Sequence, residues 1–143
     1  MLGNKAHKDP RVERLLESLS LKYQTTSAGD FKLQFDLGGG RSQTVIVNSN
    51  TETFGRLEIR EVASLGLFLQ SVPDPAIMLY LLRENGSIKL GAWRVLRGDE
   101  GTLVIFAAHI SADTDAETLM SVMKLVMRAA DELEEKFSGD DRF

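Results

Sequence analysis

The sequence of 143 residues contains no cysteine. Disulfide bonds, zinc sites built on thiolates and cysteine nucleophiles are therefore excluded. A chain without cysteine suits a reducing compartment, and we expect the protein to be cytoplasmic. The first ten residues are charged and are followed by no apolar segment, so the sequence predicts no secretory signal.

The sequence also lacks a long hydrophobic run. The longest, Ala76 to Leu82, spans seven residues, whereas a membrane helix needs roughly 20. An excess of basic residues is missing as well, because 17 Lys and Arg face 21 Asp and Glu, a net charge of −4. We therefore expect neither a membrane nor a nucleic acid as partner.

The composition is that of a globular protein, with 43% hydrophobic and 27% charged residues. Its length corresponds to about one domain. We predict a single domain over residues 1–143, with an ordered core from about 9 to 137 and flexible ends.

The first half predicts one helix and then strands. Asp9-Pro10 is a helix start, and the apolar spacing of Val12, Leu15, Leu16 and Leu19 predicts an amphipathic helix ending near Lys22. Alternating apolar residues predict three strands, at 31–37, 43–48 and 57–60. A glycine turn at 38–40 joins the first two strands, and a polar turn at 49–53 joins the second and third. Residues 62–69 are apolar without a clear period, and the pattern assigns them no element.

The second half predicts a helix over 76–84, strands over 88–96 and 102–110, and a long helix ending at Phe137. Thr114 and Glu117 fit a capping box at the start of this last helix. The predicted order is α-β-β-β-α-β-β-α, an α+β domain with a five-stranded antiparallel sheet.

The helix in the middle of the chain is apolar on nearly every side. Such a helix must be covered on more than one side, and its own sheet covers only one. We therefore predict a surface for dimerisation or partner binding, formed by Ile77, Met78, Leu79, Tyr80, Leu82 and Trp93. Tyr80 and Trp93 fit a core position as well as an interface.

Residue patterns that suggest chemistry have simpler interpretations. Gly38 to Gly40 lack the spacing of a phosphate loop and predict a hairpin turn. Asp113, Asp115 and Glu117 resemble the start of a calcium loop, but Lys124 stands where its last glutamate belongs. His109 has no base–nucleophile partner among its neighbours in the sequence. We expect no catalytic residue, no metal site and no cofactor.

The chain resembles the YbjN-type family of bacterial sensory transduction regulators, which has the type III secretion chaperone-like fold. The resemblance runs from about Arg11 to Phe137 and rests on element order and apolar spacing in FKLQFDLGGG, QTVIVNS, GRLEIREV, DPAIMLYLLRENGSIKLGAW, GTLVIFAAHI and TDAETLMSVMKLVMRAADELEEKF. It implies a homodimer without catalytic activity. The secretion chaperones of this fold hold an unfolded or extended segment of a client protein.

Two functions remain open at this point. The leading one is a homodimeric binding module, regulatory or chaperone-like, whose client adds to a free sheet edge, with the strand 31–37 as a candidate edge. The alternative is a small cone-shaped α+β enzyme or ligand-binding protein with a pocket near His109, and a pocket holding His109 and a carboxylate would favour it.

Overall fold

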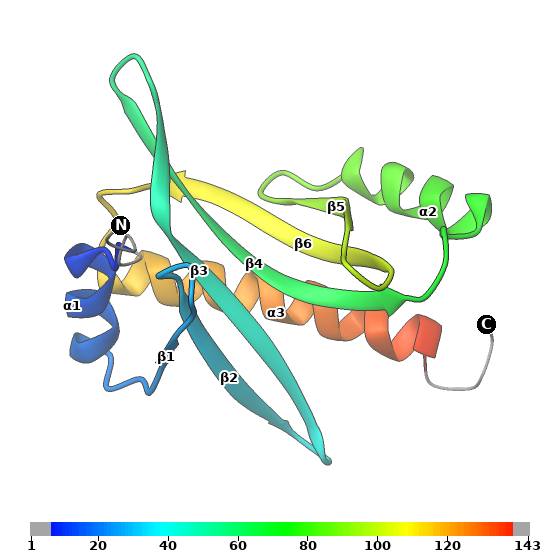
Figure 1. The fold of residues 1–143 in the computed structure, drawn as a ribbon, viewed down its shortest axis with the longest axis horizontal. Coiled ribbons are helices and arrows are strands. Elements are labelled where there is room, and N and C mark those ends of the chain that lie inside the picture. The colour runs from blue at the N-terminus through cyan, green and yellow to red at the C-terminus, as the bar shows by residue number, and fades with distance from the viewer. Residues whose placement is uncertain (1–6, 139–143) are drawn as a thin grey trace, which may run out of the picture.

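The computed structural model describes residues 7–138, and the ends predicted to be flexible lie outside the described residues. The elements are α1 (Pro10–Ser18), β1 (Gln24–Thr25), β2 (Phe31–Gly38), β3 (Arg41–Phe54), β4 (Leu57–Leu69), α2 (Pro75–Asn85), β5 (Ala92–Arg97), β6 (Thr102–Ser111) and α3 (Ala116–Ser138). The α+β class is confirmed (Figure 1).

The sheet is antiparallel throughout, in the order β1-β2-β3-β4-β6-β5. It has six strands where five were predicted, and the element order is accordingly α-β-β-β-β-α-β-β-α. The additional strand is β1, which is two residues long. A strand this short carries no alternation, so the sequence gives no sign of it.

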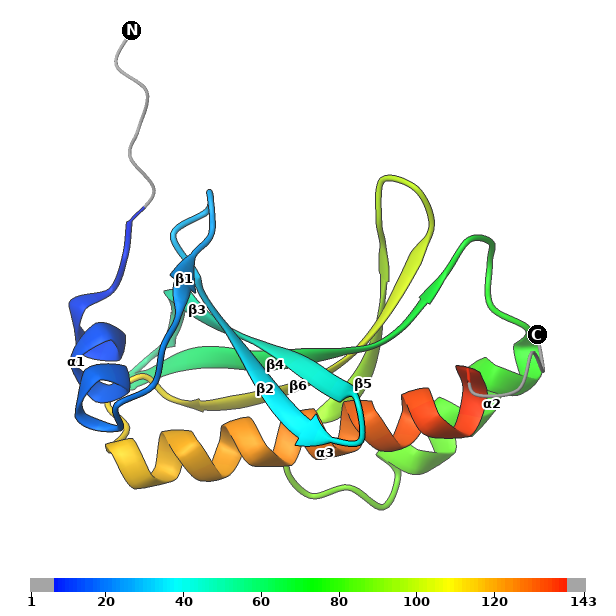
Figure 2. The same ribbon diagram turned by 90° about the horizontal axis from the view of Figure 1, so that it is seen from below.

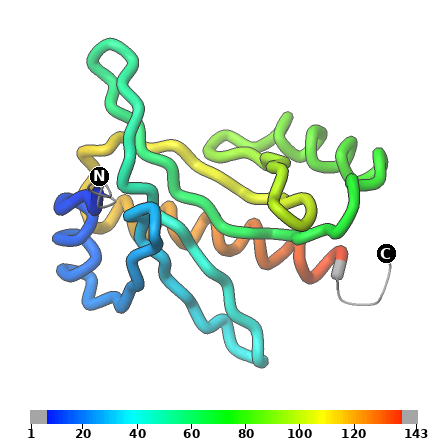
Figure 3. The backbone as a smooth tube through the Cα atoms, in the orientation of Figure 1, coloured from blue at the N-terminus to red at the C-terminus, as the bar shows by residue number. Residues whose placement is uncertain are grey.

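Strands β3 and β4 are much longer than predicted, at 14 and 13 residues. The predicted polar turn over 49–53 is wrong, because these residues continue β3 through a shift in register between Val47 and Thr51. The actual turn is Gly55-Arg56, with Gly55 at a φ of 61°, a backbone conformation that glycine adopts without strain. The β3–β4 and β2–β3 hairpins extend from the sheet in opposite directions (Figure 3).

All three helices pack on the same face of the sheet. Helix α3 runs along this face, as Figure 2 shows, and α1 lies near its N-terminal end. The larger core cluster joins α1 and α3 to the sheet through Leu16, Phe31, Val47, Val62 and Met123, among others. A second cluster joins α2 and α3 to β4 and β6 through Leu67, Ile77, Leu81, Val104 and Leu133. The opposite face carries no helix within residues 7–138.

Two helix ends differ from the prediction. Helix α1 stops at Ser18 and not near Lys22, and Ser20 follows with a φ of 57°. At the start of α3 the cap is Asp115, whose Oδ1 accepts the Thr118 backbone N–H at 2.7 Å, and not Thr114. This bond lowers the pKa of Asp115 because it favours the charged carboxylate.

A buried ion pair joins α1 to the bend in β3. Arg60 is 1% exposed, and its Nη2 donates to Asp9 Oδ2 at 2.7 Å, while its Nη1 donates to the Asn48 carbonyl at 2.7 Å. Burial alone would raise the pKa of Asp9, but hydrogen bonds from Arg11 and Arg60 outweigh this effect and hold the pKa well below its usual range. The pair therefore fixes the N-terminal helix to the register shift of β3.

Candidate functional site

Helix α2 is covered on one side only. Ile77 and Leu81 lie in the core, whereas Met78, Leu79 and Leu82 point to solvent, with Leu82 68% exposed. Ile77, which the sequence analysis included in the partner surface, contributes to the core and not to the surface. The fold of the described chain thus leaves three large apolar side chains of α2 uncovered.

Tyr80 and Trp93 are both half-buried. Tyr80 packs edge-to-face on Phe137 with ring centres 5.4 Å apart, and Trp93 packs in the same way on Phe106 at 5.0 Å. Both rings therefore belong to the edge of the core, and each presents part of its surface beside α2.

A groove of about 250 Å³ separates α2 from the edge strand β5 and is lined by Met78, Leu81, Leu82, Asn85, Trp93 and Val95. Asn85 covers part of this edge, since its side-chain amide accepts from the Trp93 N–H at 2.7 Å and donates to the Trp93 carbonyl at 3.1 Å. The sequence analysis missed Asn85 and the exposed Val95. A signal for Val95 was present, because it lies two residues from Trp93 and therefore on the same face of the strand.

The strand that was predicted as a free edge is partly covered. Strand β1 pairs with β2 only at Phe31 and Lys32. Beyond Lys32, β2 has no strand on its outer side within residues 7–138.

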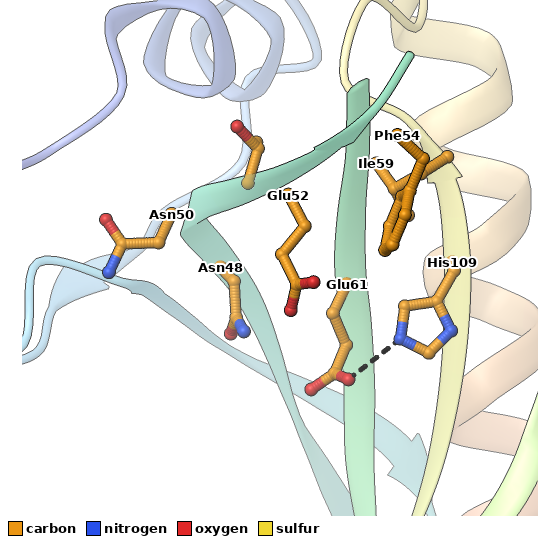
Figure 4. Close-up of a pocket in the computed structure, with 8 residues that line it drawn as sticks. Asn48, Asn50, Glu52, Phe54, Ile59, Glu61 and His109 are labelled. Carbon is orange, nitrogen blue, oxygen red and sulfur yellow. Dashed lines mark hydrogen bonds and ion pairs between the residues drawn. The ribbon is translucent and has the colours of Figure 1, made fainter. Parts of the chain in front are cut away.

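A cavity on the uncovered face of the sheet contains His109. It measures about 520 Å³ and is lined by Asn48, Asn50, Thr51, Glu52, Phe54, Ile59, Glu61 and His109. His109 Nε2 lies 3.0 Å from Glu61 Oε1, and both side chains enter the pocket from adjacent strands (Figure 4). These two residues are direct cross-strand partners on β4 and β6, a relationship that only the strand register reveals.

The charges in this pocket are partly compensated. Arg94 on β5 forms an ion pair with the same oxygen of Glu61 that contacts His109. The Thr51 hydroxyl is the only one among the lining residues, and it donates to Glu58 at 2.7 Å. The arrangement orients the imidazole, as a general base requires, but brings no activated nucleophile to it.

Within residues 7–138, no group of three or more His, Asp or Glu side chains is placed to hold a metal ion. In the same part of the chain, no helix has the length and apolar character needed to cross a membrane.

A scan of protein-family models finds none that matches this chain, and a search of curated proteins finds no match either.

Proposed function

We propose that the protein is a homodimeric, non-catalytic binding module of the YbjN type, with the type III secretion chaperone-like fold, that regulates or escorts another protein. The observation that carries the proposal is the uncovered side of α2, where Met78, Leu79 and Leu82 face solvent beside Val95. The resemblance to that family in the apolar spacing of the sequence also supports it.

The energetics favour burial of this surface. Fully burying a large apolar side chain stabilises a protein by roughly 1.5–3 kcal/mol. Met78, Leu82 and Val95 are partly exposed around one groove, and such a cluster of exposed apolar side chains is typical of a protein contact site. In a twofold dimer the same patch covers itself, so a single surface provides both sides of the interface.

Leu82→Asp tests this interface. A carboxylate in the centre of the contact must be desolvated, so the variant is expected to be monomeric by sedimentation equilibrium where the unaltered protein is dimeric. Leu57→Asp is the matched control, because Leu57 is 63% exposed at the tip of the β3–β4 hairpin and lies away from α2. An unaltered protein that is monomeric at micromolar concentration, or a dimer unaffected by Leu82→Asp, would contradict the proposal.

A second candidate function is supported by the pocket around His109. An imidazole 3.0 Å from a carboxylate in a cavity of about 520 Å³ is an arrangement found in ligand-binding and catalytic sites. Under this alternative, His109→Ala abolishes binding of a small molecule and leaves the dimer intact. The pairing of Glu61 with Arg94 favours the binding role over proton transfer, because Arg94 occupies the same Glu61 oxygen that contacts His109.

A further inference from the structure

The uncovered face of the sheet does not have the composition expected of a face in water. In an antiparallel sheet with helices on one side, the other side is normally polar. Strand β2 follows this rule, because Lys32, Gln34 and Asp36 occupy its uncovered side. Strands β4 and β6 break it.

The register of β4 and β6 gathers six apolar residues on this face. Ala63 pairs with Ala107, Leu65 with Ile105, and Phe68 with Leu103. We call these six residues the apolar strip. Leu65 is 41% and Phe68 47% exposed, whereas Ala63 and Ala107 are buried. Leu96, which pairs with Leu103, extends the strip onto β5.

The dimensions of the strip fit a helix. From Ala63 to Phe68 the strand advances roughly 17 Å, about three turns of an α-helix. From β4 across β6 to β5 the width is roughly 10 Å, about the diameter of a helix with its side chains. The strip lies on a sheet face and not at an edge, so it suits packing of side chains better than addition of a strand.

The charge at one end of the strip indicates what the helix should carry. The pair Glu61–His109 lies two positions along the strands from the pair Ala63–Ala107, so the pocket of about 520 Å³ continues the strip towards the β3–β4 hairpin. Glu61 is paired with Arg94, whereas Glu52 makes no ion pair within the described residues. The pocket therefore retains a negative charge, beside the exposed ring of Phe54 (Figure 4). A Lys or Arg side chain is complementary to both groups.

We propose that the apolar strip binds an amphipathic helix of a partner protein, with a basic residue of that helix entering the pocket between Glu52 and Glu61. The inference deepens the proposed binding role and rests on it, but it uses the face of the sheet opposite to α2. The dimer and the partner therefore occupy different surfaces, and each can be tested alone.

The probes are two synthetic helical peptides of about 15 residues, long enough to span the strip. Both carry leucine on one face, and the polar face carries lysine in one peptide and glutamate in the other. Titration into the isotope-labelled protein is expected to shift the backbone amide resonances of β4 and β6 around the strip. The lysine peptide is expected to bind at least tenfold more tightly than the glutamate peptide.

Variants locate the site. Leu65→Glu is expected to weaken binding of the lysine peptide at least tenfold, and Glu52→Gln to weaken it by about twofold to fivefold, the effect of one exposed charge pair. Leu125→Glu is the matched control, because Leu125 is 37% exposed, close to the 41% of Leu65, but lies on α3 on the other side of the sheet. Phe68→Ser repeats the test without a new charge, and circular dichroism verifies the fold of each variant.

Three results would overturn the inference. Amide shifts confined to α2 and the β5 edge would show that the peptide does not bind the apolar strip. Equal affinity for both peptides would show that no basic residue of the partner is recognised by the pocket. Dissociation of the dimer by Leu65→Glu would make a second copy of the chain the occupant of the strip. A dimer that persists in Leu82→Asp contradicts the proposed interface only. The peptide titration still tests the apolar strip, because the two surfaces are different.

Discussion

Single residues in this protein decide which face of a strand turns inward. Leu57 and Ile59 alternate with Glu58 and Arg60, and the apolar members would ordinarily be the buried ones. The structure does the reverse, since Leu57 is 63% exposed and Arg60 1%. Arg60 can be buried because Asp9, 51 positions earlier, supplies its counterion, and the bend in β3 supplies carbonyl acceptors. A buried charge is tolerated only with such partners.

The first prediction removes this arginine. Arg60→Met keeps most of the side-chain volume but removes one of the two arginines that pair with the buried Asp9 carboxylate. We expect the free energy of unfolding at pH 7, measured with urea, to fall by about 3 kcal/mol. Arg56→Ala at the exposed hairpin turn is the control, with an expected change within about 0.5 kcal/mol.

The same variant has a defined pH dependence. The folded pKa of Asp9 is depressed, so its contribution to stability is complete above the pKa of the unfolded chain, about 4, and is lost as the pH falls towards the folded value. The difference between the unaltered protein and Arg60→Met should therefore narrow below about pH 4. A difference that is constant from pH 7 to pH 3 would show that the ion pair is not its source.

The helices and strands that could be predicted from the sequence are those with one solvent-exposed face and one buried face. Helix α1 and strand β2 have this form, and their periods identified them. Strand β4 does not, because residues 62–69 pack on α3 from one side and carry the apolar strip on the other, with an extra residue at Gly66 in the pairing with β6. The missing alternation that left this segment unassigned is thus a consequence of two apolar faces.

Residues of the candidate sites could be predicted only where they belong to a single helix or strand. Met78, Leu79 and Leu82 were identified because consecutive apolar residues exceed what one side of a helix can bury. The pair of His109 and Glu61 could not be identified, because the two residues are 48 positions apart and meet through the register of β4 and β6. Arg94, from a third strand, completes the group.

The start of α3 gives the second prediction. Thr114 and Asp115 are both good capping residues, and the structure assigns the cap to Asp115, whose carboxylate accepts the Thr118 N–H. Asp115→Ala is expected to lower the free energy of unfolding by about 1 kcal/mol. Thr114→Ala should change the free energy of unfolding by less than about half as much as Asp115→Ala. A larger loss in Thr114→Ala than in Asp115→Ala would instead support the capping box predicted from the sequence.

The whole molecule presents two apolar surfaces on different sides of one sheet. The side of α2 that faces solvent lies at the β5 edge with the helices, and the apolar strip lies on the face that no helix covers (Figure 2). Strands β6 and β5 separate the two surfaces, since residues alternate between them along each strand. Val95 and Arg94 are neighbours in sequence, yet one lines the groove beside α2 and the other contacts Glu61.

This separation predicts that the two surfaces act independently. The Leu82→Asp monomer should bind one lysine peptide per chain with the affinity of the dimer, within about twofold, because no residue of the strip lines the groove beside α2. In the same titration calorimetry, Leu65→Glu should lose the peptide while sedimentation still shows a dimer. Energetic effects at sites without shared contacts are additive, so the double variant should show both losses and nothing more. A loss of peptide affinity of tenfold or more in Leu82→Asp would instead mean that the partner helix spans both protomers, and that dimerisation completes the site.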